Sequence, residues 1–159
     1  TGYVYLDAGT TLWPLAAKLN NHGHLNLRFI TNDVAIASIL AQKSISHILL
    51  GGNLHPVTKT LSGPVSQEQL CQYNFEVCFI SVNGVDKEGN VTCSVIEEAI
   101  LKKQVMKQSV RKVLMAAASK WDKQAPAKIA DLKDFDIWVC DEPQKEIKRF
   151  CRRNGVELR

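Results

Sequence analysis

The sequence predicts a three-layer α/β fold in which a mostly parallel sheet lies between helices on both faces. Short apolar runs recur along the chain, and each is followed by a longer amphipathic or polar segment, the order that alternating strands and helices produce. Several runs are almost wholly apolar, as in Val77-Cys78-Phe79-Ile80-Ser81-Val82, which is typical of parallel strands covered on both faces. The length of 159 residues is that of one domain with a substantial core.

The apolar runs place strands at residues 3–7, 27–31, 46–50, 76–82, 111–116 and 135–140. The amphipathic segments place helices at residues 11–20, 33–42, 65–72, 94–108 and 143–154. Gly155 ends the last helix, because glycine readily adopts the left-handed conformation of a helix C-terminus, and residues 156–158 add a short strand. No repeat or linker interrupts this order, so we expect one domain over residues 1–159.

The first strand breaks into the first helix through Leu6-Asp7-Ala8-Gly9-Thr10-Thr11. Such a turn leaves backbone N–H groups free at the positive end of the helix dipole, which suits a phosphate or carboxylate. The alternative is that Thr10 simply caps the helix. Taken alone, the motif favours the cap, since hydroxyl residues at helix starts are mostly caps.

Three later strand ends carry similar polar or glycine-rich segments: Thr31-Asn32-Asp33, Gly51-Gly52-Asn53 and Asn83-Gly84-Val85-Asp86. Each segment alone is equally consistent with an ordinary turn. In open parallel sheets, however, ligands bind beyond the carboxyl ends of the strands, where neighbouring loops converge. The repetition along one sheet edge therefore predicts a shared pocket.

Composition argues against several classes of protein. No apolar run approaches the ~20 residues of a membrane-spanning helix, so we expect no membrane contact. The net charge of +4 is modest for a nucleic-acid reader, and the helical spacing of Lys145, Lys148, Arg149 and Arg152 indicates a solvated helix face.

Cysteine and histidine spacing predicts neither a disulfide framework nor a metal site, and we expect no cofactor. The five cysteines include no C-x-x-C pair, which favours reduced thiols and a cytoplasmic location. His22 and His24 are close, but no further ligand follows at metal-site spacing.

Six motifs in order carry a family resemblance. They are Leu6-Asp7-Ala8-Gly9-Thr10-Thr11, Ile30-Thr31-Asn32, Leu50-Gly51-Gly52, Asn83-Gly84-Val85-Asp86 with Gly89, Glu98 with Lys102, and Ser119-Lys120-Trp121. From about residue 3 to its end, the chain resembles the C-terminal sensor domain of DeoR-family transcriptional repressors. The resemblance implies the fold of ribose-5-phosphate isomerase, or sugar-phosphate isomerase / CoA-transferase-like fold, and a domain without catalytic residues that binds a phosphorylated sugar effector.

In that family, a winged helix-turn-helix domain precedes the sensor. The chain contains no such segment, so we expect DNA binding only through an upstream part, and a homo-oligomer as regulators commonly form. Carried over by motif, Gly9, Thr10 and Thr11, beside Asp7, would cradle the phosphate. Thr31 and Asn32 would line the neighbouring loop, while Gly51, Gly52 and Gly84 would let backbone approach the ligand. Asp86, Glu98, Lys102 and Lys120 would contact the sugar.

Two alternative interpretations stay open, and the sequence differs from the family pattern at one place. Glu98 and Lys102 are four residues apart on a predicted helix, and could equally form an exposed pair worth about 0.3–0.5 kcal/mol. The related fold of isomerases makes sugar-phosphate isomerisation the alternative function, with Asp86 or Glu98 as the base. Where the family usually has an Ala-Asp-Ser-Ser-Lys type sequence, this chain has Ala116-Ala117-Ala118-Ser119-Lys120, which removes hydrogen-bond acceptors from the expected pocket.

Overall fold

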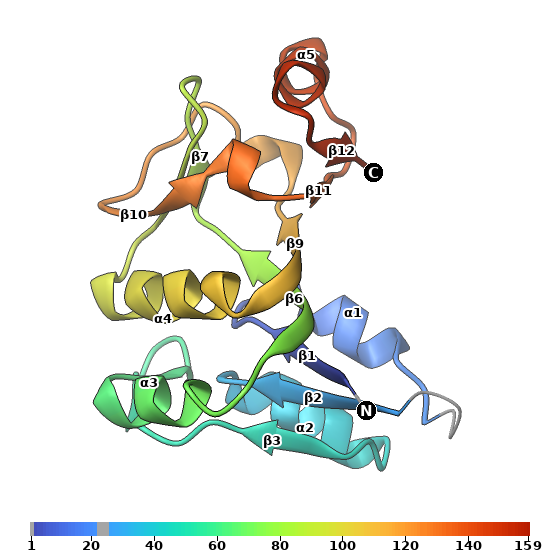
Figure 1. Ribbon diagram of the computed structural model, residues 1–159, viewed down its shortest axis with the longest axis vertical. Helices are drawn as coiled ribbons and strands as arrows, with labels where there is room; N and C mark the ends of the chain where they lie inside the picture. Colours follow the sequence, from blue (N-terminus) through green and yellow to red (C-terminus); the bar gives the residue numbers. More distant parts are fainter. Residues whose placement is uncertain (1, 22–25) are drawn as a thin grey trace.

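The computed structural model describes residues 2–21 and 26–159, and a seven-stranded parallel sheet runs through its centre (Figure 1). The strand order is β12-β11-β9-β6-β1-β2-β3, and every neighbouring pair is parallel. The strands are β1 (Gly2–Leu6), β2 (Leu27–Thr31), β3 (His47–Leu49), β6 (Phe75–Ser81), β9 (Ser109–Met115), β11 (Ile137–Val139) and β12 (Glu157–Leu158). The predicted strands are thus confirmed to within a few residues.

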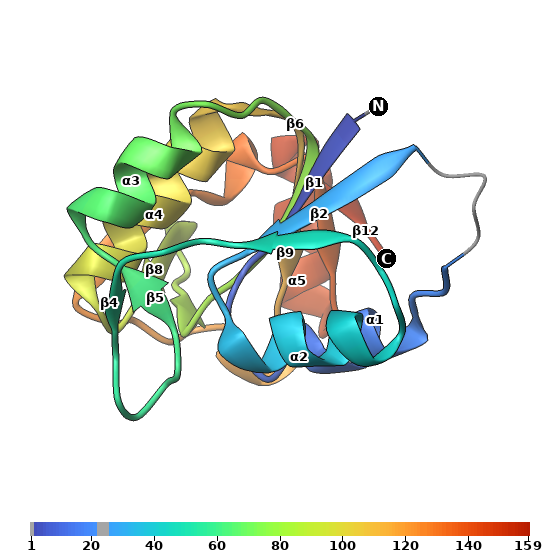
Figure 2. The ribbon, with the colours of Figure 1, turned by 90° about the horizontal axis from the view of Figure 1, so that it is seen from below.

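Helices cover both faces of this sheet, as the view from below shows (Figure 2). They are α1 (Trp13–Lys18), α2 (Val34–Gln42), α3 (Pro64–Leu70), α4 (Ile96–Lys107) and α5 (Lys145–Asn154). One core joins Leu12 and Ile36 of the α1 and α2 side to Val4 and Leu6 of β1. The opposite core joins α3, α4 and α5 to the other sheet face. The predicted three-layer α/β fold is confirmed.

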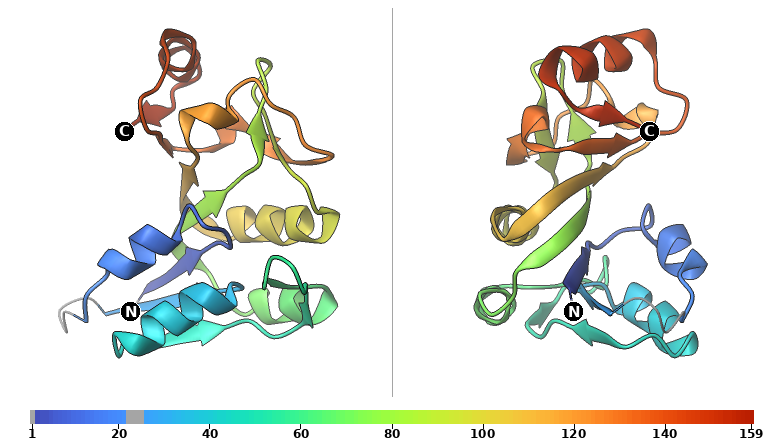
Figure 3. Two further views of the ribbon diagram at one scale, coloured as in Figure 1. Left: turned by 180° about the vertical axis from the view of Figure 1, so that it is seen from behind. Right: turned by 45° about the vertical axis from the view of Figure 1, so that its right-hand side comes forward.

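Several short elements were not predicted. They are the antiparallel hairpin β4 (Asn53–Leu54) and β5 (Leu61–Ser62), the antiparallel sheet of β7 (Gly84–Val85), β8 (Asn90–Cys93) and β10 (Ala127–Asp131), and the 3-10 helices η1 (Ala118–Lys120) and η2 (Leu132–Asp134). Most of these strands are too short to show an alternating pattern, and β8 pairs with β10 from far along the chain. Figure 3 shows this small sheet beside the upper part of the main one.

The C-terminus of α5 and the N-terminus of α1 test two of the sequence predictions. Gly155 ends α5 in the left-handed conformation, with φ of 71°, as expected. The first helix begins only at Trp13, and its N-cap residue Leu12 offers no side-chain hydrogen bond. The prediction that Thr10 caps this helix is therefore wrong, because the turn continues past Thr10 before helical geometry begins.

Three further features concern membrane-spanning helices, cysteines and metal ligands. No helix in residues 2–21 and 26–159 is long and apolar enough to cross a membrane. All five cysteines have free thiols. His22 and His24 lie outside the described residues, and within those residues no three His, Cys, Asp or Glu side chains gather as a metal site would require.

Candidate functional site

A cavity of about 290 Å³ lies at the carboxyl edge of the parallel sheet, where β1, β6 and β9 end. Hydroxyl and amide side chains, one carboxylate and two lysines dominate its wall. The lining residues are Ala8, Gly9, Thr10, Thr11, Thr58, Thr60, Ser81, Val82, Asn83, Ser94, Val95, Glu98, Lys102 and Lys120. A larger groove of about 550 Å³ lies against α4 and β10, but its walls are mainly apolar surface and lysine, and none of the strand-end motifs lines it. Its position and polar lining make the smaller cavity the candidate site.

A buried ion pair lies beneath the cavity. Lys102 is 3% exposed and Asp7 is 1% exposed, and the ammonium of Lys102 donates to Asp7 Oδ2 and, at 3.2 Å, to the carbonyl of Ser81. Asp7 Oδ2 also accepts from the backbone N–H of Ser81 at 2.9 Å. The prediction of an exposed pair between Glu98 and Lys102 is wrong, because Lys102 turns inward to Asp7. Its charge is neutralised within the protein.

Tyr5 extends the buried network behind this pair. Burial and the nearby Asp7 raise the pKa of the Tyr5 hydroxyl well above its usual value, so it stays protonated and acts as a donor. It donates to Asn32 Oδ1 at 2.9 Å, and the Asn32 amide donates in turn to the carbonyl of Leu61 at 3.0 Å. The sheet is thereby joined to the β4–β5 hairpin.

The hairpin contributes to the cavity through Thr58 and Thr60. Thr60 is 3% exposed, and its hydroxyl donates to Glu98 Oε1 on α4 at 3.0 Å. Glu98 thus connects the hairpin, the first turn of α4 and the cavity wall. A ligand that takes the place of Thr60 at Glu98 Oε1 would compete directly with the hairpin contact.

The turn after β1 is held in an unusual backbone conformation. Gly9 has φ of +126°, and a Cβ there would lie 3.0 Å from Ser81 Oγ, so the position favours glycine. Its N–H is not free, since it donates to Asp33 Oδ2 at 3.0 Å. Thr10 and Thr11 are exposed in the wall, and within the described residues their backbone N–H groups have no hydrogen-bond partner. In this turn, the backbone N–H groups that remain available to a ligand are therefore those of Thr10 and Thr11.

Lys120 and the start of α4 supply the remaining positive potential. Lys120 is half-buried on η1 and makes no ion pair with any described residue, in contrast to Lys102. Ser94 and Val95 precede the first turn of α4 and line the cavity, and Val95, the N-cap, gives no side-chain hydrogen bond to that turn. The first N–H groups of a helix have no intrahelical partner. The Lys120 ammonium and the N-terminal amides of α4 therefore border the same cavity as the Glu98 carboxylate.

The structure places other predicted site residues outside the cavity wall. Thr31 and Asn32 are buried behind it, where the Thr31 hydroxyl accepts from the N–H of Asp33 at 3.1 Å. Gly51 and Gly52 pack against α3 and β5. Gly51 donates to Gln69 Oε1 of α3 at 2.7 Å, and a Cβ on Gly52 would meet Ser66 Oγ of α3 and lie 2.6 Å from the carbonyl of Ser62 in β5. These two glycines serve as a strand-ending turn, the alternative reading of that motif.

Gly84 and Asp86 also have local structural roles. A Cβ on Gly84 would lie 2.3 Å from the carbonyl of Lys123, so the close approach it permits is to backbone of the same chain. Asp86 closes the turn between β7 and β8, where its carboxylate accepts from the N–H of Asn90 and the Asn90 side chain, both at 2.8 Å. Neither residue lines the cavity.

Several lining residues were not predicted. Ser81 is the last residue of β6 and Asn83 follows it, at a strand end that the sequence already marked, and Ser94 precedes a helix predicted in nearly the right place. Thr58 and Thr60 belong to a hairpin whose strands are too short to recognise, so the sequence offered no signal for them. The alanines at 116–118 do not line the cavity, and Ala118 donates its N–H to Asp141 Oδ1 at 2.6 Å. Ala117, where the chain departs from the family pattern, is thus not among the lining residues.

The sequence is similar to one family model and to several curated transcriptional regulators. Residues 1–142 match the family model described as the DeoR C terminal sensor domain. An HTH-type transcriptional regulator GlpR of Haloferax volcanii is 30% identical over 87% of this chain and 53% of its own length. A lactose phosphotransferase system repressor of Staphylococcus epidermidis is 32% identical over 91% of this chain and 57% of its own. The chain thus spans just over half the length of these curated relatives.

Comparison with solved structures agrees with the fold. Ribose 5-phosphate isomerase A from Neisseria gonorrhoeae superposes with a TM-score of 0.52 at 15% identity, over 76% of this chain and 46% of the isomerase. The isomerase from Plasmodium falciparum gives a TM-score of 0.51 at 14% identity. At this level of identity the likeness concerns the fold alone.

Proposed function

We propose that this chain, which belongs to the family of DeoR C-terminal sensor domains, binds a phosphorylated sugar in the cavity at the carboxyl edge of its sheet. One observation carries the proposal: Lys120, a lysine without an ion-pair partner among the described residues, shares that cavity with the open amides of Thr10 and Thr11 and with a carboxylate. A cation and amides suit a phosphate, whereas Glu98 suits sugar hydroxyls. The relatives' names, a lactose phosphotransferase system repressor among them, support a link to sugar metabolism.

The effector would act by linkage. A ligand shifts a protein between two conformations only by its difference in affinity for them. The β4–β5 hairpin offers such a difference, because Thr60 donates to Glu98 at the cavity wall. A sugar hydroxyl that took over Glu98 would release this contact and favour another hairpin position. In the whole protein, that change would alter the DNA affinity of an attached domain.

The alternative, sugar-phosphate isomerisation, receives less support. Its base would be Asp86 or Glu98, but Asp86 is committed to the β7–β8 turn and Glu98 to Thr60. We therefore propose a sensor and not an enzyme. A coupled assay with ribose 5-phosphate and glucosamine 6-phosphate tests this directly: turnover of ~1 per second or more, lost in Glu98→Gln, would favour the isomerase.

Thermal unfolding with a panel of pentose and hexose phosphates, their unphosphorylated parents and inorganic phosphate tests the site. A ligand at about 100 times its Kd adds about 2.7 kcal/mol of stability, a readily measured rise in Tm. We expect phosphorylated sugars to stabilise much more than their parents, and Lys120→Gln to remove most of that difference. Lys123→Gln, an exposed lysine outside the cavity, makes the same change of charge and should respond like the parent chain. An undiminished response in Lys120→Gln would place the phosphate elsewhere.

A further inference from the structure

The excess positive charge of the chain resides on one helix. Helix α5 carries five cations, all exposed, and a single carboxylate, Glu146. The cations are Lys145, Lys148, Arg149, Arg152 and Arg153. Five cations against one carboxylate give +4, which is the net charge of the whole chain, so all other residues together are neutral. We call these five residues the basic stripe.

Helix stability explains only the two stripe residues of the last turn, Arg152 and Arg153, where cations favour the helix dipole. Residues three and four apart are neighbours on a helix surface, so Lys145 faces Arg149 and Arg149 faces Arg153, and such like-charge pairs destabilise a helix. Lys145 stands at the first helical position, where a cation also opposes the helix dipole. No stripe residue forms an ion pair within the described residues, and Glu146 instead accepts from Trp121 Nε1 at 3.4 Å. The charges are therefore left for something outside the domain.

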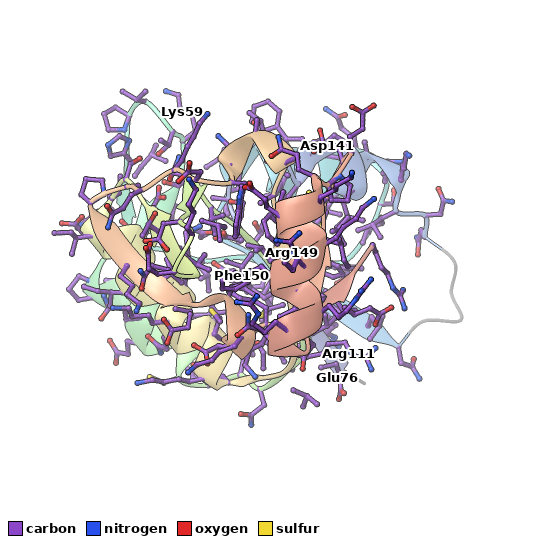
Figure 4. All side chains as sticks on the ribbon, turned by 90° about the horizontal axis from the view of Figure 1, so that it is seen from above. Lys59, Glu76, Arg111, Asp141, Arg149 and Phe150 are labelled. Atoms are coloured by element: carbon purple, nitrogen blue, oxygen red, sulfur yellow. The ribbon has the colours of Figure 1, made fainter. Side chains whose placement is uncertain are left out.

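The cations of the basic stripe form a row along the helix and do not point toward a single site. With a rise of 1.5 Å per residue, Lys145 to Arg153 covers ~12 Å of helix surface, while Ile147 and Cys151 anchor the opposite face in the core. Seen from above, α5 lies across the top of the molecule, with Arg149 and Phe150 on it (Figure 4). A groove of about 320 Å³ borders the stripe at Arg149 and Arg153, and Lys87 stands in the same groove.

We propose that the basic stripe of α5 contacts the phosphate backbone of duplex DNA without reading its sequence. A row of exposed cations suits a linear polyanion better than a single phosphate group, since each lysine or arginine can neutralise a successive phosphate. DNA is the polyanion that fits a chain whose relatives are named transcriptional regulators. Contacts to phosphate groups carry no sequence information, so this contact supplies affinity and no specificity. The proposal concerns α5 alone and does not depend on the effector cavity.

Fluorescence anisotropy of a labelled duplex of random sequence, titrated with the chain at several KCl concentrations, tests the proposal. If about four stripe cations each neutralise one phosphate, log Kobs falls with log[KCl] at a slope of about −3.6, so affinity drops ~50-fold between about 50 and 150 mM salt. Arg149→Gln with Arg153→Gln should weaken binding at low salt and reduce the slope to about −1.8, a ~7-fold drop over the same range. Both substitutions leave the effector cavity intact, so the response of this double variant to sugar phosphates should match the parent's.

A matched double variant separates the stripe from net charge. Lys103→Gln with Lys107→Gln removes two exposed cations from α4 and leaves α5 unchanged. We expect this control to keep the parent slope. Equal losses in the two double variants, or no binding at the lowest salt, would overturn the proposal. So would binding to vesicles rich in anionic lipid, or to an acidic protein, when no DNA binding is seen, because the stripe would then serve another partner.

Discussion

The buried pair of Lys102 and Asp7 allows a quantitative test of the structure. In Lys102→Met the apolar stem is kept, but the Asp7 carboxylate, 1% exposed, loses its cation. Removing one partner of a buried pair costs about 3–5 kcal/mol, because the other charge is left uncompensated. The N–H of Ser81 still donates to Asp7 at 2.9 Å, so we expect the lower part of that range, near 3 kcal/mol.

A double-mutant cycle isolates the interaction itself. Asp7→Asn keeps an oxygen that can accept from Ser81 and from Lys102, but alone it leaves the Lys102 ammonium without a carboxylate to neutralise its charge. Combined with Lys102→Met it removes both charges, so the double variant should be more stable than the sum of the single losses predicts, by roughly 2 kcal/mol. Urea unfolding followed by circular dichroism measures all four free energies of unfolding. Lys103→Met, an exposed neighbour on α4, is the matched control and should stay within about 0.5 kcal/mol of the parent.

The reasoning would be refuted by a small effect. A loss below about 1 kcal/mol in Lys102→Met, equal to that of the exposed control, would mean that the lysine reaches solvent. A coupling energy near zero would mean that the two charges do not meet. Either result would also remove the argument that Lys120, rather than Lys102, is the cation left free for a ligand.

Two further predictions concern stability. Gly52→Ala should destabilise the chain by more than about 2 kcal/mol in urea unfolding, because Gly52 has φ of +132° and the new Cβ would meet the Ser62 carbonyl of β5. Any response to sugar phosphates should persist. A loss under about 0.5 kcal/mol would contradict the close approach of β5 to this glycine. Burial raises the pKa of the Cys78 thiol from 9.0 to about 11. Its contribution to stability is therefore present below pH 9.0 and lost as pH rises toward about 11, because the unfolded thiol ionises first. Unfolding free energies between these limits should fall less steeply in Cys78→Ala, by up to about 1.4 kcal/mol per pH unit, and identical slopes would contradict burial of the thiol.

The order of strands and helices could be read from the sequence because it rests on local chemistry. Most of the apolar run 77–82 lies in β6 at the centre of the sheet, where Cys78 and Ile80 are buried, and Gly155 ends α5 through a property of glycine itself. The same local signals mark strand ends, and parallel strands bring those ends to one edge. For this reason the general position of the pocket was predictable, while ligand binding by its residues stays a prediction.

Contacts between distant residues were decided by the tertiary structure alone. Glu98 and Lys102 have ideal spacing for a surface pair, yet strand β1 places Asp7 beneath Lys102 and the hairpin places Thr60 against Glu98. The motif Gly51-Gly52 is consistent with either a ligand loop or a packing site, and the approach of α3 makes it the latter. Hydrophobic periodicity records which face of an element is buried but not which element covers it. That choice depends on the simultaneous packing of all the layers, and it separates the residues of the cavity wall from those that merely shape it.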